Sequence, residues 1–169
     1  MKQSFSQKHI KSIVYGGLDG IITTFAVVSG VIGAQLNPSI ILILGFANLI
    51  ADGISMGVGD YLSSKAEQEK RHRKSRGAII NGMVTFGSFV IFGFVPLLFF
   101  ILAQFWNMFE LYMFPGSIFL TAATLLALGY LKARVVKVPP VISSLETLVI
   151  GGVAAIVAYL IGWGISGLI

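Results

Sequence analysis

The chain has 169 residues, of which 56% are hydrophobic and 11% are charged. Soluble domains carry about 25% charged residues, so this composition excludes a soluble protein and indicates a membrane protein with a single domain. The chain contains no cysteine, which excludes a disulfide framework and thiolate metal sites. The net charge of +5 indicates basic cytoplasmic loops and contact with anionic lipid, and we expect no nucleic-acid partner.

Apolar segments of about 20 residues, long enough to cross a bilayer, occur five times along the chain. The predicted fold class is therefore an all-α integral membrane protein, and the second span is expected to continue as a polar cytoplasmic helix over residues 63–76. Asn37-Pro38 and Pro139-Pro140 predict breaks between spans, and Pro96 predicts a kink within the third. The predicted spans cover residues 13–36, 39–62, 78–103, 112–131 and 145–168.

The basic residues all lie on one side of these spans. The lysines and arginines precede the first span or connect the second with the third and the fourth with the fifth. This bias predicts a cytoplasmic N-terminus and a C-terminus outside the cell or in an organelle lumen. Because five spans cannot form two inverted halves, a two-fold arrangement would require a homodimer. Short loops and the absence of a targeting leader favour a prokaryotic inner membrane, with a vacuolar or other organelle membrane as the alternative.

Asp19 is the one acidic residue of the first span. It lies about 9 Å along a helix that starts near residue 13, with Thr23 on the same face. A purely structural interpretation is that its carboxylate caps a neighbouring helix or reaches the interface. Aspartate is short for that depth, so we favour a role in binding a metal ion or a proton.

A polar stripe runs along the second span, because Asn48, Asp52, Met56 and Asp60 recur at four-residue spacing. This spacing places them on one helix face over about 18 Å. Oxygen ligands beside a thioether suit Fe²⁺ or Mn²⁺ better than Mg²⁺ or Ca²⁺. On spacing alone, Met56 is more often a packing residue and Asp60 is equally well explained as a solvated entrance residue. Asp52 lies near mid-membrane and needs a partner.

Other classes of function find little support. The chain has no nucleophile–base pair, no phosphate-binding glycine loop and no zinc signature, so neither catalysis nor a bound cofactor is expected. A membrane-embedded metal-dependent enzyme usually needs further carboxylates at the membrane surface. A passive divalent-cation channel could use the same residues as a transporter. A membrane partner protein without transport activity leaves the polar stripe unexplained.

Two long segments closely resemble the vacuolar iron transporter family: residues 19–30 (DGIITTFAVVSG) and 48–61 (NLIADGISMGVGDY). Residues 129–134 and 148–162 also resemble the end of its fourth span and its last span. The resemblance implies a homodimer that moves Fe²⁺, and often Mn²⁺, out of the cytosol in exchange for protons. It implies a path at the dimer interface that uses Asp19 and Met56.

On this basis metal is expected to enter past Asp60, to bind Asp19 and Met56 with Asp52 and Asn48 nearby, and to be displaced by protons. The chain departs from iron-storing plant members of the family, which carry a glutamate-rich cytoplasmic domain between the second and third spans. Here that connection is short and rich in basic residues. Neither cytosolic metal capture nor a preference for iron over manganese is therefore implied.

Overall fold

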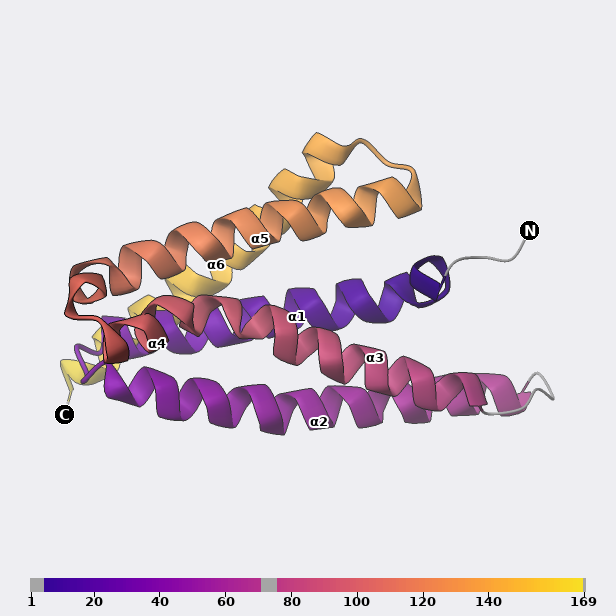
Figure 1. Ribbon diagram of the computed structural model, residues 1–169, viewed down its shortest axis with the longest axis horizontal. Helices are drawn as coiled ribbons and strands as arrows, with labels where there is room; N and C mark the ends of the chain where they lie inside the picture. Colours follow the sequence, from indigo (N-terminus) through magenta and orange to yellow (C-terminus); the bar gives the residue numbers. More distant parts are fainter. Residues whose placement is uncertain (1–4, 71–75, 169) are drawn as a thin grey trace.

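A computed structural model describes residues 5–70 and 76–168, and the regular structure within these ranges is entirely helical (Figure 1). Five helical segments there are long and apolar enough to cross a membrane, which confirms the predicted all-α membrane class. The third of these segments comprises α3, η1 and α4. In chain order the elements are α1 (Phe5–Gly33), α2 (Ser39–Lys70), α3 (Arg76–Gly93), η1 (Val95–Leu97), α4 (Leu98–Phe105), η2 (Asn107–Tyr112), α5 (Met113–Val136) and α6 (Pro140–Ser166).

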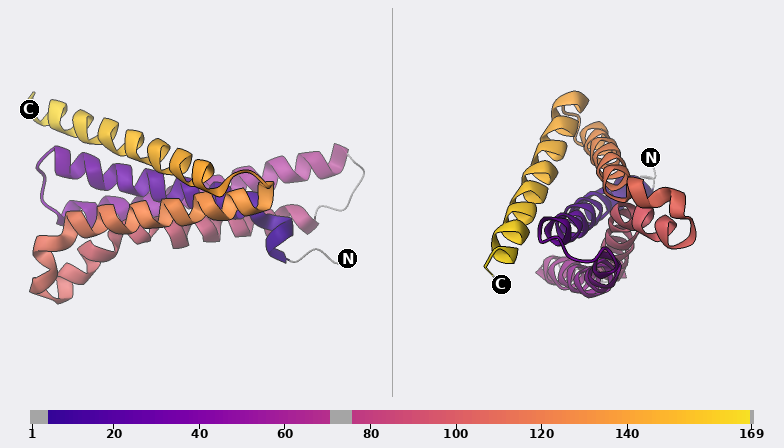
Figure 2. Two further views of the ribbon diagram at one scale, coloured as in Figure 1. Left: turned by 90° about the horizontal axis from the view of Figure 1, so that it is seen from above. Right: turned by 90° about the vertical axis from the view of Figure 1, so that its left-hand side faces the viewer.

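Helix α1 lies at the centre of the bundle, where it contacts α2, α3, α5 and α6. The main apolar core forms where α1, α2 and α3 meet, around Val28, Leu49 and Phe89. By contrast α6 lies at the edge of the bundle, where it diverges from α5 toward its C-terminal end (Figure 2) and packs on α1. Only 6% of its membrane-spanning window is buried, compared with 56% for α1. Helix α6 and the outer face of α2 are therefore left to lipid or to another chain.

The turn between α1 and α2 forms where Asn37-Pro38 predicted it. Helix α1 ends at Gly33, short of the predicted residue 36, because Gln35 adopts a left-handed conformation with φ 56°. The amides of Gln35 and Leu36 donate back to the carbonyls of Ile32 and Val31, at 3.0 and 3.1 Å. These two bonds form a Schellman motif, which satisfies carbonyls at the helix end. The Asn37 side chain then accepts a hydrogen bond from the Ser39 amide at 2.9 Å and caps α2.

The predicted kink at Pro96 is a complete break in the α-helix. Helix α3 ends at Gly93, and the 3₁₀ turn η1 separates it from α4. Proline causes this because its ring has no N–H to donate and clashes with the preceding turn. The Ser117 hydroxyl of α5 donates to the Pro96 carbonyl at 2.7 Å, which fixes the bend against the next helix.

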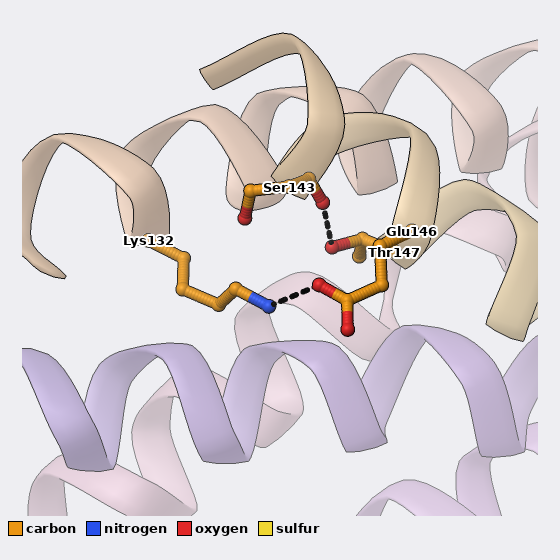
Figure 3. A network of polar contacts seen from close by, with 4 residues as sticks. All are labelled: Lys132, Ser143, Glu146 and Thr147. Carbon is orange, nitrogen blue, oxygen red and sulfur yellow. Dashed lines mark hydrogen bonds and ion pairs between the residues drawn. The ribbon is translucent and has the colours of Figure 1, made fainter. Parts of the chain in front are cut away.

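Helices α5 and α6 pair at the end where predicted cytoplasmic residues lie. Helix α5 ends at Val136, beyond the predicted span, where Lys137 adopts a left-handed conformation with φ 61°. Helix α6 begins at Pro140, at the predicted Pro139-Pro140 break. The Lys132 ammonium group lies 3.1 Å from the Glu146 carboxylate (Figure 3). Beside this ion pair, the Thr147 hydroxyl donates a hydrogen bond to the Ser143 carbonyl. This ion pair ties the first turns of α6 to α5.

Helix α2 continues into the predicted extension over residues 63–76 as far as Lys70, and residues 71–75 lie outside the described part. Glycines allow α3 to pack closely on both of its neighbours. A Cβ at Gly82 of α3 would lie 2.5 Å from the Gly57 carbonyl oxygen of α2. On the other side, a Cβ at Gly20 of α1 would overlap the backbone of Phe89. Small residues at such contacts let helix backbones approach in a membrane.

Candidate metal-binding site

Asp19 of α1 and Asp52 of α2 carry like charges that lie close enough to repel each other. Asp19 is half-buried, whereas Asp52 is exposed. Within residues 5–70 and 76–168, neither carboxylate has a hydrogen bond or an ion pair with another side chain. Two like charges without a counter-charge in an apolar span are unfavourable unless a cation joins them. The structure thus brings together the two carboxylates that the sequence placed deepest.

Met56 lies one helical turn beyond Asp52 and has two kinds of neighbour. One side of it packs against the core formed by α1, α2 and α3. The other side lines a groove of about 490 Å³, so the thioether is only partly buried. The remaining residues of the groove come from α1 and α2, namely Lys11, Tyr15, Ser55, Gly59, Asp60 and Ser63. Packing and metal contact are therefore not exclusive alternatives for Met56.

Asp60 is held by hydroxyl groups from three helices. Its carboxylate accepts hydrogen bonds from Ser12 of α1 at 2.7 Å, from Ser64 of α2 at 3.2 Å, and from Thr85 of α3. Ser64 in turn accepts a bond from Asn81, whose side-chain oxygen lies 2.7 Å from a ring nitrogen of the buried His9. Asp60 lines the groove, yet most of its hydrogen-bonding capacity is already used.

Asn48 also contacts α1 through side-chain polar groups. Its amide donates to the hydroxyls of Thr23 and Thr24, at 3.4 and 3.5 Å. Thr23 itself donates to the backbone carbonyl of Asp19 at 2.8 Å. Asn48 is therefore linked, through one threonine, to the turn of α1 that carries Asp19.

The metal ligands that one chain offers are incomplete. In the described part of the chain, no group of three histidine, cysteine, aspartate or glutamate side chains lies close enough to hold a metal ion. Asp19 and Asp52 supply carboxylates and Met56 supplies a thioether, and of these three side chains only that of Asp52 is exposed. First-row cations need at least four ligands, so the remainder would have to come from water or from a second chain.

Sequence reasoning missed the partners of Asp60. Ser12 and Thr85 are buried hydroxyls on α1 and α3, and small hydroxyl residues are common in membrane helices. No pattern around either residue in the sequence identifies it as a hydrogen-bond partner of Asp60.

Comparisons with known proteins agree with the family suggested by the motifs. The family model described as "VIT family" matches residues 10–78 and 69–163 of the chain. A relative named vacuolar iron transporter 1, from Tulipa gesneriana, is 25% identical over 225 residues, covering 93% of this chain and 90% of that protein. A vacuolar iron transporter of Toxoplasma gondii is 52% identical over 64 residues. A vacuolar iron transporter of Plasmodium falciparum is 46% identical over 66 residues.

The two parasite matches are local, covering 38% and 39% of this chain but only 21% and 24% of those relatives. All three names describe transporters, which agrees with the expectation that the chain is not an enzyme. They also describe vacuolar proteins, which fits the organelle alternative, and they give no support to a prokaryotic inner membrane. The family model matches well over half of the chain, whose described residues include five helices suited to crossing a membrane, and this multi-pass membrane protein belongs to the VIT family.

Proposed function

We propose that this protein moves a divalent first-row metal ion, Fe²⁺ or Mn²⁺, out of the cytosol in exchange for protons, across a vacuolar or other organelle membrane. The observation that supports this most directly is the pair of unneutralised carboxylates, Asp19 and Asp52, beside the Met56 thioether. Ionisable groups within a membrane span are costly and commonly mark an ion path. The relatives' printed names concern iron and support the choice of metal.

The three residues contribute different ligand atoms to the proposed site. Asp19 and Asp52 supply negative charge and oxygen ligands, which bind any divalent cation. Met56 supplies a sulfur, which interacts better with Fe²⁺ than with Mg²⁺ or Ca²⁺ and so contributes selectivity. The groove beside Met56 and Asp60 gives the Met56 thioether access from the predicted cytoplasmic end.

A homodimer would complete the site. Asp52 lies on the exposed face of α2, so a second copy related by a two-fold axis would bring an identical set of ligands to the same face. Two carboxylates and one thioether from each copy would then surround the ion. The path would run between the copies, where the little-buried α6 and the outer face of α2 lie.

Proton exchange follows from the chemistry of carboxylates in an apolar environment. A metal ion neutralises them while it is bound, and a proton does so after the ion leaves. Metal and proton therefore compete for Asp19 and Asp52, and a proton gradient directed into the cytosol would drive metal the other way.

Uptake of Fe²⁺ or Mn²⁺ by proteoliposomes with an imposed pH gradient tests this proposal. Asp19→Asn should abolish most of the uptake and the accompanying proton movement, whereas Glu146→Gln, in the first turns of α6, should keep both. Uptake by Asp19→Asn at the wild-type rate would refute the role of Asp19. Metal flux without proton counter-movement, unaffected by a proton ionophore, would show a passive channel instead.

A further inference from the structure

The polar stripe of α2 divides into two kinds of residue. The outer members, Asn48 and Asp60, are hydrogen-bonded to other helices. The inner members, Asp52 and Met56, have no side-chain hydrogen bond within the described residues. Helical spacing places the four residues on one face, but it does not show that their side chains differ in what they already contact.

We propose that Asp60 and Asn48 are positioning residues that hold α1 against α2, and that the metal is bound between them by Asp19, Asp52 and Met56. This inference rests on the proposed function, because it assigns roles within the same site. It departs from the expectation that Asp60 serves the entry of the metal and that Asn48 contributes to its binding.

The first contact is the Asp60 cluster, defined as Asp60 with Ser12, Ser64 and Thr85. One carboxylate oxygen accepts bonds from Ser12 and Thr85, and the other accepts from Ser64. Bonds from hydroxyls to an ionised carboxylate are about twice as strong as bonds between neutral groups. To bind a metal ion, Asp60 would have to give up these bonds and leave the buried Thr85 hydroxyl without its acceptor.

The second contact is the Asn48 cluster, defined as Asn48 with Thr23 and Thr24. Its bonds are longer, at 3.4 and 3.5 Å, but Thr24 is fully buried at the packed side of α1. An amide that donates both bonds toward threonine hydroxyls faces α1 and not the exposed side of the stripe, where Asp52 lies.

The two clusters bracket the site along α1. Ser12 precedes Asp19 and Thr23 follows it by one turn, while on α2 the clusters lie one turn to either side of Asp52 and Met56. One contact between two helices permits sliding or rotation about that point, whereas two contacts at different heights prevent both. The clusters thus fix Asp19 opposite Asp52 and Met56. Groups that orient metal ligands in this way typically change metal affinity 10–100-fold.

Equilibrium binding of Mn²⁺ to the purified protein, followed by electron paramagnetic resonance, separates a positioning role from a ligand role. The double variant Ser12→Ala, Thr85→Val leaves the Asp60 carboxylate in place and frees it. A positioning role predicts Mn²⁺ binding weakened by about tenfold. Asp60→Asn, which keeps an acceptor oxygen for the hydroxyls, should bind within about threefold of wild type. A ligand role predicts the reverse order, with Asp60→Asn the weaker binder, and that order would overturn the proposal.

The Asn48 cluster is tested by removing both of its threonine partners. The variant Thr23→Val, Thr24→Val should weaken Mn²⁺ binding as much as Asn48→Ala, and combining the three substitutions should be no worse, because the same two hydrogen bonds are lost in each case. If the threonine variant binds like wild type while Asn48→Ala is impaired, Asn48 is a ligand. Ser88→Ala is the matched control for Thr85→Val, because it removes a buried hydroxyl from α3 that does not contact Asp60.

Asp19→Asn in the same assay keeps this inference separate from the proposed function. If Asp19→Asn binds Mn²⁺ like wild type, the proposed site itself is wrong. If Asp19→Asn loses binding but the Ser12/Thr85 double variant binds like wild type, only the positioning role is refuted. The chain has no cysteine, so a spin-label pair at Tyr15→Cys and Leu62→Cys can report the spacing of α1 and α2 directly. The double variant should broaden that distance distribution, and an unchanged distribution would count against the proposal.

Discussion

The substitution Gly82→Ala tests whether the close packing of α2 and α3 supports the site. A Cβ at this position would lie 2.5 Å from the Gly57 carbonyl oxygen and 2.9 Å from the Tyr61 Cβ. Carbon–oxygen contacts between helices are about 3.3 Å, so the helices would have to separate by about 0.8 Å. A backbone carbonyl cannot avoid the contact by changing rotamer, so the displacement falls on the helices themselves.

The energetic consequence has two opposing parts. Overpacking of this kind costs about 1–3 kcal/mol, and the higher helix propensity of alanine returns about 1 kcal/mol. We expect a net loss of up to about 2 kcal/mol, or a lowering of Tm by up to about 8 °C. Because α2 and α3 would separate one turn from Thr85, the hydrogen bond from Thr85 to Asp60 should weaken. We therefore also expect weaker Mn²⁺ binding, since the Asp60 cluster positions the ligands.

Thermal unfolding in detergent and Mn²⁺ binding measure these two effects. The control is Gly87→Ala on the same helix, where an added Cβ meets nothing within 4 Å and the propensity gain stands alone. Gly87→Ala should therefore match or exceed wild-type stability. If Gly82→Ala is as stable as Gly87→Ala and binds Mn²⁺ normally, the close approach at Gly57 does not support the site.

Two further predictions concern the metal itself. Met56→Leu keeps the apolar volume but removes the sulfur, so it should lower Fe²⁺ uptake several-fold relative to Mn²⁺ in a competition assay; equal effects on both ions would limit Met56 to packing. Mn²⁺ at 100 times its Kd should stabilise the wild type by about 2.7 kcal/mol, and a chelator should reverse this; the same stabilisation in Asp19→Asn would show that the ion binds elsewhere.

Much of the fold could be predicted from the sequence because its signals are local. Apolar runs of membrane-spanning length set the five segments, Asn37-Pro38 marks the first turn, and Pro96 marks the break between α3 and α4. Helix ends were predicted less well. Gln35 and Lys137 adopt left-handed conformations, which a glycine at these positions would have indicated in the sequence. They shift the ends of α1 and α5 from the predicted residues.

The site could be predicted only in part, because four-residue spacing shows which residues share a face but not what each one contacts. The proximity of Asp19 and Asp52 depends on how α1 crosses α2. That crossing is set by packing between helices and is not visible in either motif. Likewise the hydroxyls of Ser12 and Thr85 reach Asp60 from helices far apart in sequence, so nothing near Asp60 in the chain predicts them.

The glycine contacts of the central helices bear on which parts of the protein can move. Gly16 and Gly20 of α1 meet the backbone of α3, and Gly82 of α3 meets that of α2, so sliding any of these helices would drive backbone atoms into one another. Gly33 of α1 and Gly162 of α6 meet the backbone of the opposite helix in the same way. Helices α1, α2, α3 and α6 should therefore move as one rigid body. The shape changes of a transport cycle would then be rocking motions of this four-helix body against a second copy, with the metal ligands carried along unchanged.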